Sequence, residues 1–168
     1  MANSIISEYR VTFEPLSRDA TRLLSEACGI DFSGANFATD HWLCCTVYRR
    51  KDIAAIIVFE FKTDFDAHVT TAVWDPRALS RKLLTSVLRT VFGYVKRITA
   101  LIDPENTRAL QQVWRFGFKH EGYMRRGIDG KRDAVMFGLL PEDCPYLYGE
   151  PFRMRVVQPT HDQPIGVQ

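Results

Sequence analysis

The sequence has few cysteines, no long apolar run and no metal-binding motif. Its four cysteines include no CxxC pair, and the adjacent Cys44 and Cys45 would point to opposite faces of a strand. We therefore expect neither a zinc site nor a disulfide framework, and a reducing cytoplasm as the compartment. No apolar run approaches the ~20 residues of a membrane span, so no membrane partner is expected. Because His41, His120 and His161 have no metal-ligand spacing with nearby carboxylates, no metal cofactor is expected either.

Repeats are also absent, and low-complexity sequence does not appear before the C-terminal part. At 168 residues, with 46% hydrophobic and 12% aromatic residues, the chain is long enough for one folded domain with a core. The first residues lack the basic segment and apolar core of a signal peptide. We expect a domain over residues 1–145 and a tail over 146–168. In the tail, 152–157 alternates as an edge strand that docks on the domain or on a second subunit of a homodimer.

The charge is small overall and unevenly distributed. Residues 1–76 carry 7 basic and 11 acidic side chains (net −4), residues 77–132 carry 13 and 4 (net +9), and the rest carry 2 and 5 (net −3). A basic central segment suits a polyphosphate ligand or a nucleic acid, the latter through residues 119–132. Arginines on solvated helix faces would account for part of the same excess.

Hydrophobic periodicity predicts a chain that mixes strands and helices. Residues 30–40 are predicted to be a loop or a short helix, and Asp75-Pro76 and Asp129-Gly130 are predicted turns. The predicted strands are 8–16, 41–49, 53–62, 68–74, 95–102, 118–126 and 133–140, and the predicted helices are 17–27, 79–94 and 106–117. Antiparallel strands thus come first, then one βαβ crossover, then a closing strand pair.

The most informative stretch runs from Asn106 to Gly122. Asn106 is placed to cap a helix, whose apolar face is formed by Leu110, Val113 and Trp114, and Gly117 is placed to end it. Many βαβ units with a glycine stop would look the same, so the rest of the chain must decide.

This stretch, with Asn106, Ala109 and the Gly117-Phe118 pair, resembles the second half of the GNAT superfamily of acyl-CoA-dependent N-acyltransferases. Residues 96–140 look similar to the Rim-type ribosomal-protein acetyltransferases. Closer still are divergent GNAT-like proteins of bacteriophages and prophages, through Glu121-Gly122, Arg125 and Asp143-Cys144. The resemblance covers roughly residues 40–145. It implies an α+β fold, with one mostly antiparallel mixed sheet and acetyl-CoA between the fourth and fifth strands.

The resemblance also implies where the cosubstrate binds. The family's pyrophosphate loop falls on residues 75–81, so that Arg77, Ala78, Leu79, Ser80 and Arg81 become the candidate cofactor-binding residues. Both family glycines are replaced, by Ala78 and Ser80, and Asp75 is unfavourable beside phosphate. A capped helix that binds nothing would have the same sequence features.

The resemblance implies further cosubstrate contacts on both sides of the site between the fourth and fifth strands. The amide of Val73 or Trp74 would supply the oxyanion donor. Asn106, with Ala109 beside it, would bind the pantetheine arm or substrate, although a simple helix cap would account for Asn106 as well.

The resemblance assigns His68 to the position where many members carry a catalytic glutamate, with Glu60 on the preceding strand as a second base. A solvent-facing histidine at a strand edge is the alternative for His68. The tyrosine that serves as general acid in many members is replaced by Val113, and Tyr123 is the substitute candidate.

The predicted function is transfer of an acetyl group from acetyl-CoA to a primary amine of a protein, a small molecule or a modified nucleobase. The alternatives are a phage structural or host-interaction protein that keeps the fold without turnover, and a nucleic-acid binder. A phage-encoded chain would act in the host cytoplasm. Trp42, Trp74 and Trp114 are interpreted as core or rim residues rather than base-stacking platforms.

Overall fold

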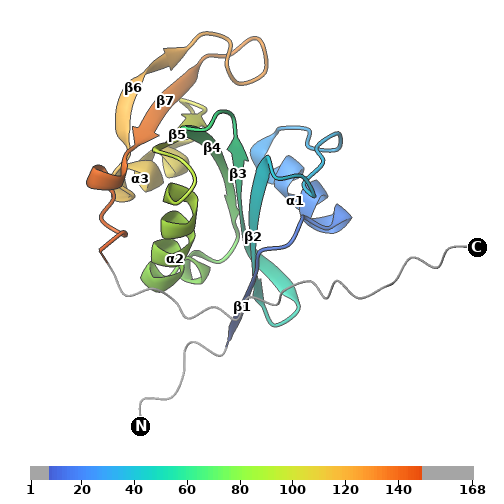
Figure 1. The fold of residues 1–168 in the computed structure, drawn as a ribbon. Helices are drawn as coiled ribbons and strands as arrows, with labels where there is room; N and C mark the ends of the chain where they lie inside the picture. The colour runs from blue at the N-terminus through green and yellow to red at the C-terminus, as the bar shows by residue number, and fades with distance from the viewer. Residues whose placement is uncertain (1–7, 149–168) are drawn as a thin grey trace, which may run out of the picture.

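The computed structural model describes residues 8–148, which form a seven-stranded sheet with helices on both faces (Figure 1). In chain order the strands are β1 (Tyr9–Thr12), β2 (Trp42–Arg49), β3 (Asp52–Phe61), β4 (Asp66–Val73), β5 (Arg97–Ile102), β6 (Lys119–Met124) and β7 (Ala134–Leu139). The helices are α1 (Arg18–Cys28), α2 (Arg81–Phe92) and α3 (Thr107–Arg115), with 3-10 turns η2 (Pro76–Ala78) and η3 (Pro141–Asp143). The predicted α+β class is confirmed, as are its strands and helices within this range, except that the first strand spans residues 9–12 and not 8–16.

The sheet is antiparallel except at one strand pair. Its order is β1-β2-β3-β4-β5-β7-β6, and only β4 and β5 run parallel, joined through α2 in the predicted crossover. The sequence predicted a closing strand pair but not that β7 would lie between β5 and β6. The reason is burial: β7 is almost wholly buried, whereas β6 is mostly exposed and takes the edge.

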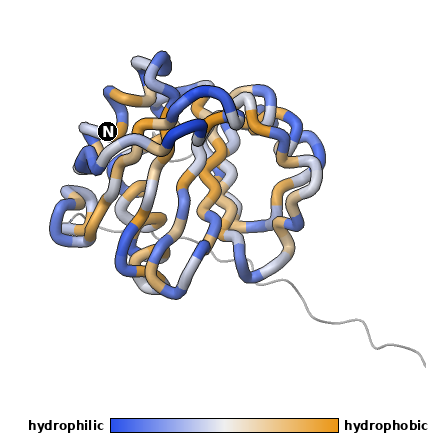
Figure 2. Tube along the Cα trace, turned by 90° about the horizontal axis from the view of Figure 1, so that it is seen from above, coloured by the Kyte–Doolittle hydropathy of each residue, from blue (hydrophilic) through white to orange (hydrophobic). Residues whose placement is uncertain are grey.

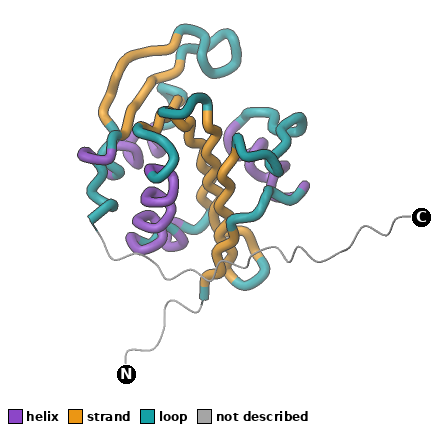
Figure 3. The backbone as a smooth tube through the Cα atoms, in the orientation of Figure 1, coloured by secondary structure: helices purple, strands orange, loops and turns teal. Residues whose placement is uncertain are grey.

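The two faces of the sheet are covered by different helices. α1 lies on one face, and α2 and α3 lie on the other (Figure 3). Adjacent Cys44 and Cys45 mark the division as predicted, because Cys44 packs with Leu24 on the α1 side and Cys45 with Val87 on the α2 side. Seen from above, apolar residues follow the central strands and polar residues concentrate in the peripheral loops (Figure 2).

Local signals account for where the helices begin and end. Ser17 accepts a bond from the Ala20 amide at 3.1 Å, and Gly29 ends α1 in the left-handed conformation (φ 66°). α2 begins at Arg81, two residues later than predicted, because residues 76–78 form the separate turn η2. Residues 30–40 form turns and no second helix.

Two features are absent from residues 8–148. No helix there is long and apolar enough to cross a membrane. No three His, Cys, Asp or Glu side chains there are grouped so that they could hold a metal ion. The strand predicted at residues 152–157 lies outside the described range.

Candidate functional site

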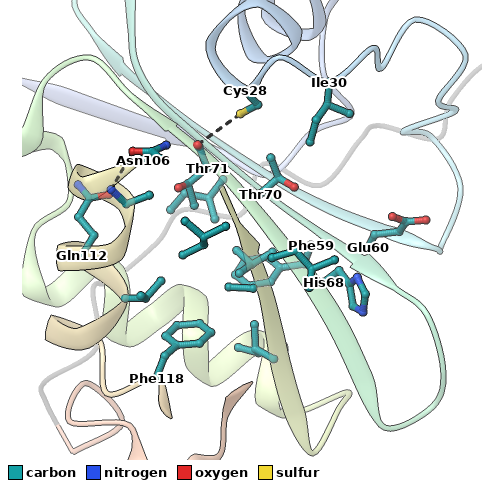
Figure 4. A pocket seen from close by; sticks show the side chains of 18 of the residues that line it. Cys28, Ile30, Phe59, Glu60, His68, Thr70, Thr71, Asn106, Gln112 and Phe118 are labelled. Carbon is teal, nitrogen blue, oxygen red and sulfur yellow. Dashed lines mark hydrogen bonds between the residues drawn. The ribbon is translucent and has the colours of Figure 1, made fainter. Parts of the chain in front are cut away.

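The single parallel strand pair separates after three residues. Residues 66–68 of β4 pair with residues 97–99 of β5, and beyond them the described parts of the two strands have no pairing across this seam. A cavity of about 630 Å³ occupies the opening. It is lined by Cys28 and Ile30 from the α1 face and by Leu84, Val87 and Phe118 from the other face (Figure 4). This cleft therefore passes through the sheet.

The backbone of β4 borders the cleft with polar groups. The Trp74 amide donates to the Ala54 carbonyl of β3 at 2.9 Å, so the even-numbered residues of β4 direct their backbone groups toward β3. Strand alternation then directs the amides of Thr71 and Val73 toward the opening. Of the two predicted oxyanion donors, Trp74 thus has its amide already bonded, and Val73 has an amide that faces the gap.

The carbonyl of Thr71 has a partner from α1. The Cys28 thiol donates to it at 3.6 Å (Figure 4). Burial raises the pKa of this thiol to about 11, so it remains protonated as the donor. Both residues line the cleft. Sequence analysis missed them, although Gly29, which ends α1, indicates that Cys28 lies at a helix end.

Two predicted bases meet at the closed end of the opening. Glu60 and His68 are register partners on β3 and β4, and both line the cleft (Figure 4). The Glu60 carboxylate lies 2.5 Å from the Lys62 ammonium, which neutralises it. The His68 side chain is 28% exposed, and its Nε2 lies 3.6 Å from Asp66 Oδ2. The charged neighbour of Glu60 is thus a cation, whereas that of His68 is an anion, which favours a proton on the imidazole.

The carboxylate beside His68 is held in place from β5. The buried Thr99 hydroxyl donates to Asp66 at 2.8 Å, and Arg97 lies 3.5 Å from it. Arg97 also pairs with Glu121 at 2.7 Å, and its pKa is raised chiefly by the hydrogen bond to Glu121. Because its position is fixed, Asp66 can orient the imidazole.

The carboxylate of the loop before α2 has partners within the loop and on neighbouring strands. Asp75 accepts hydrogen bonds from Arg77 Nε at 3.1 Å and from the Tyr9 hydroxyl at 2.7 Å. These hydrogen bonds lower the pKa of Asp75 to about 2, and the bond from Arg77 has the larger effect. The unfavourable carboxylate is thereby neutralised, and the same pair engages one of the two predicted phosphate-binding arginines.

The other predicted loop residues have mixed roles. Ala78 is buried, and Leu79 lines the cleft. Ser80 accepts a bond from the Leu83 amide at 3.2 Å and so caps α2.

The chain after β7 lies along α2. Three side chains one turn apart donate to three consecutive carbonyls: Arg81 to Pro145 at 2.9 Å, Thr85 to Tyr146 at 2.7 Å, and Arg89 to Leu147 at 2.8 Å. The Arg81 guanidinium also lies 5.3 Å from the centre of the Tyr146 ring. We call residues 144–147 the C-terminal strap. It engages the second predicted phosphate-binding arginine.

The start of α3 faces the cleft. Asn106 accepts a bond from the Ala109 amide at 3.0 Å, which is the predicted cap, and both residues line the cleft. The cap uses the side-chain oxygen of Asn106 and leaves its NH₂ group for a ligand. Gln112, one turn on, also lines the cleft, and sequence analysis missed it.

The predicted substitute acid lies elsewhere. Tyr123 is 65% exposed on β6, and its ring contacts His120 at 5.4 Å between centroids. No tyrosine of residues 8–148 is among those that line the cleft, and Val113, at the family's tyrosine position, is buried.

Comparison with known proteins gave structural matches alone. No protein-family model matches the chain, and no curated protein sequence matches it. It is similar to the spermidine N-acetyltransferase of Vibrio cholerae in complex with CoA and spermine, at 13% identity and a TM-score of 0.56, covering 84% of this chain and 99% of that one. It is similar to a GNAT-family acetyltransferase of Streptococcus pneumoniae (18%, 0.53, 79% and 99%). RimJ of Mycobacterium smegmatis in complex with CoA-disulfide also matches (17%, 0.52, 80% and 84%).

These matches agree with the topology. The three matches extend over 79–84% of this chain, each with a TM-score above 0.5. The chain therefore has the fold of the GNAT N-acetyltransferases.

Proposed function

We propose that this protein transfers an acetyl group from acetyl-CoA to a primary amine. The observation that carries the proposal is the opening between β4 and β5, which has a polar backbone edge, an apolar lining and His68 at its closed end. An extended pantetheine arm can occupy the place of the missing strand pairing, bonded to the Val73 amide. The solved relatives with bound CoA and spermine support this donor and an amine acceptor.

The pyrophosphate would bind at residues 77–81, where the amides that begin α2 and two arginines meet. To bind phosphate oxygens, Arg77 would have to leave Asp75, and Arg81 would have to leave the Pro145 carbonyl of the strap. On the other side of the arm, the Asn106 amide and Ala109 would contact the pantetheine.

His68 would act as the base. The amine nitrogen gives up a proton to the imidazole and attacks the thioester carbonyl carbon, so that a C–N bond forms and the C–S bond breaks. The electron pair leaves on sulfur as a thiolate. Because an ordinary thiol has a pKa of ~8.5, its thiolate departs without a general acid, and Tyr123 needs no part in this step. Asp66 would hold the imidazole in orientation, and Glu60 would stay paired with Lys62.

The oxyanion donor must lie near His68. Residues in a strand are ~3.3 Å apart, so Val73 is about 16 Å along β4 from His68, and Thr71 is about 10 Å away. A carbonyl reached through the His68 side chain is therefore closer to the Thr71 amide. We assign the oxyanion to Thr71 and the pantetheine to Val73.

The test has two stages. Titration calorimetry with acetyl-CoA on the full chain should give binding below millimolar concentration. Acetyl transfer to spermine and to an N-terminal peptide is then followed by mass spectrometry. His68→Gln should lower the rate by ~10²–10⁴ without weakening acetyl-CoA binding. His41→Gln, an exposed histidine outside the cleft, is the matched control.

One observation favours a second candidate, a GNAT-fold protein without turnover. Both predicted phosphate-binding arginines already have partners, in Asp75 and in the strap. Absence of acetyl-CoA binding at millimolar concentration would reject the enzyme and support this candidate. Acetyl-CoA binding with His68→Gln as active as the unaltered chain would instead reject the assigned base.

A further inference from the structure

A row of aromatic rings lies outside the cleft. Trp114 on α3 contacts Phe137 on β7 at 5.4 Å between ring centroids, Phe137 contacts His120 on β6 at 5.7 Å, and His120 contacts Tyr123 at 5.4 Å. Phe137 is buried, whereas Trp114 is 58% and Tyr123 65% exposed. We call these four rings the aromatic row. Because Phe137 is buried, it gives Trp114 and His120 a fixed ring to pack against.

A bulge in β6 aligns the row. His120 pairs with Phe137 and Tyr123 pairs with Val135, while Glu121 between them has no register partner. The extra residue brings His120 and Tyr123 to the same face although they are three positions apart. Glu121 is directed away from the row and pairs with Arg97 at 2.7 Å. The one carboxylate of β6 is thereby removed from this surface.

The row ends beside a turn with unpaired cations. Arg125, Arg126 and Lys131 lie in the β6–β7 turn, are exposed, and form no side-chain ion pair within residues 8–148. Arg132 in the same turn pairs with Asp103 and Asp129. Residues 105–133 carry seven basic and four acidic side chains, a net charge of +3. The hairpin rises above the rest of the sheet, so this turn is accessible (Figure 1).

We infer that the aromatic row and the β6–β7 turn bind single-stranded nucleic acid. Cations that follow the phosphates and rings that stack on bases are the two elements by which proteins hold single strands. A duplex keeps its base faces covered, so it would use the cations alone. The sequence favoured a core or rim position for Trp114. In the structure the Trp114 ring packs against the buried Phe137 ring but is itself exposed, so it is available for stacking. The inference does not depend on acetyl transfer.

The surface adjoins the cleft. Gly127 and Ile128, in the turn that carries the cations, line the cleft. A strand bound to Arg125 and Arg126 would therefore lie beside the cleft mouth.

Fluorescence anisotropy of an end-labelled 20-nucleotide single-stranded DNA, titrated with the full chain between 50 and 200 mM salt, tests the inference. Three cations on phosphates predict a slope of log affinity against log salt of about −2. Trp114→Ala and Tyr123→Ala should each weaken binding about ten-fold. Trp114→Phe should retain most of it, and the unlabelled duplex should compete less well than the single strand.

The chain offers matched controls. Arg126 and Arg50 are both exposed turn arginines with a backbone φ of 57°, so Arg126→Glu should weaken binding and Arg50→Glu should not. Tyr94 is 69% exposed with one ring contact, to Phe61 at 5.8 Å, and Tyr94→Ala is the control for Tyr123→Ala. Thermal melting of each variant separates lost binding from lost folding.

Three results would overturn the inference. The first is no binding of the single strand at 50 mM salt. The second is an affinity for heparin, a polyanion without bases, equal to that for the single strand, together with single-strand binding that Trp114→Ala leaves unchanged. The third is self-association of the chain in light scattering that Trp114→Ala abolishes, which would make the aromatic row a contact between two copies.

Discussion

α2 and α3, the two helices on one side of the cleft, begin alike but differ in what covers them. Each follows an Asp-Pro turn, at Asp75-Pro76 and at Asp103-Pro104, in which the aspartate accepts a bond from the amide two residues on. α2 is then covered along its length by the C-terminal strap, whereas α3 meets residues 143–145 only at its C-terminal end. The first turn of α3 therefore stays open to the cleft. Two similar turns thus lead to different helix starts: the strap contacts the start of α2, and the start of α3 faces the cleft.

The largest effect should come from Gly117, where α3 meets the strap region. Its φ is 88°, and an added Cβ would collide with the Asp143 carbonyl and approach Pro145 within 2.9 Å. Gly117→Ala should lower the free energy of unfolding by more than ~2 kcal/mol, measured by urea denaturation. Gly34→Ala, with nothing within 4 Å and no positive φ, should change it little. Equal effects would mean that the end of α3 is not fixed by this contact.

The next effect concerns the strap on α2. Thr85 is fully buried, and its hydroxyl donates to the Tyr146 carbonyl at 2.7 Å. Thr85→Val removes the donor and keeps the shape, so the unfolding free energy should fall by ~1–2 kcal/mol. Thr90→Val, which loses a bond to a carbonyl of its own helix, should cost less. If both cost the same, the strap contributes nothing through this bond.

A smaller effect should separate the two Asp-Pro turns. Asp75→Asn keeps the turn and frees Arg77 from its ion pair, so acetyl-CoA affinity should rise about two- to five-fold, as expected for ~0.3–1 kcal/mol of charge at a helix start. Asp103→Asn removes a carboxylate from the other turn, leaves Arg132 paired with Asp129, and should leave the affinity unchanged. Calorimetry measures both. A rise in both variants would show that overall charge, not the α2 turn, determines the affinity.

The smallest effect is a dependence on pH. Hydrogen bonds from Arg77 and Tyr9 lower the pKa of Asp75 to about 2 on folding. A carboxyl with a lowered pKa stabilises the fold above its unfolded value of ~3.9, and this contribution is lost as the pH falls from there toward about 2. Urea denaturation at pH 5, 4 and 3 should show a shallower decline for Asp75→Asn than for the unaltered chain. Parallel declines would exclude Asp75 as a source.

Much of the fold was predictable because its signals are local. The cap Asn106 and the glycine at 117 lie where the sequence predicted them. The alternation that separates Cys44 from Cys45 needs only the strand period. The place of β7 between β5 and β6 was not predictable, since it depends on which of two strands is buried by the rest of the chain.

The candidate site was predictable in part. His68 and Glu60 were expected near one another, and the register makes them direct partners at the closed end of the cleft. Cys28 was missed because its bond to Thr71 joins residues 43 positions apart. The partners of Arg77 and Arg81 were missed as well. A sequence gives the charge of an arginine but not the carboxylate or carbonyl that engages it.

The sequence by itself determined the elements of this protein: where helices start and stop, which strand faces are apolar, and that one crossover interrupts antiparallel strands. These follow from backbone sterics, capping and periodicity, which act over a few residues. Only the tertiary structure decided that β4 and β5 separate after His68, that the strap occupies α2, and that Trp114 and Tyr123 lie in one row. Those features arise from contacts between distant segments, which depend on how the faces pack and not on any local pattern.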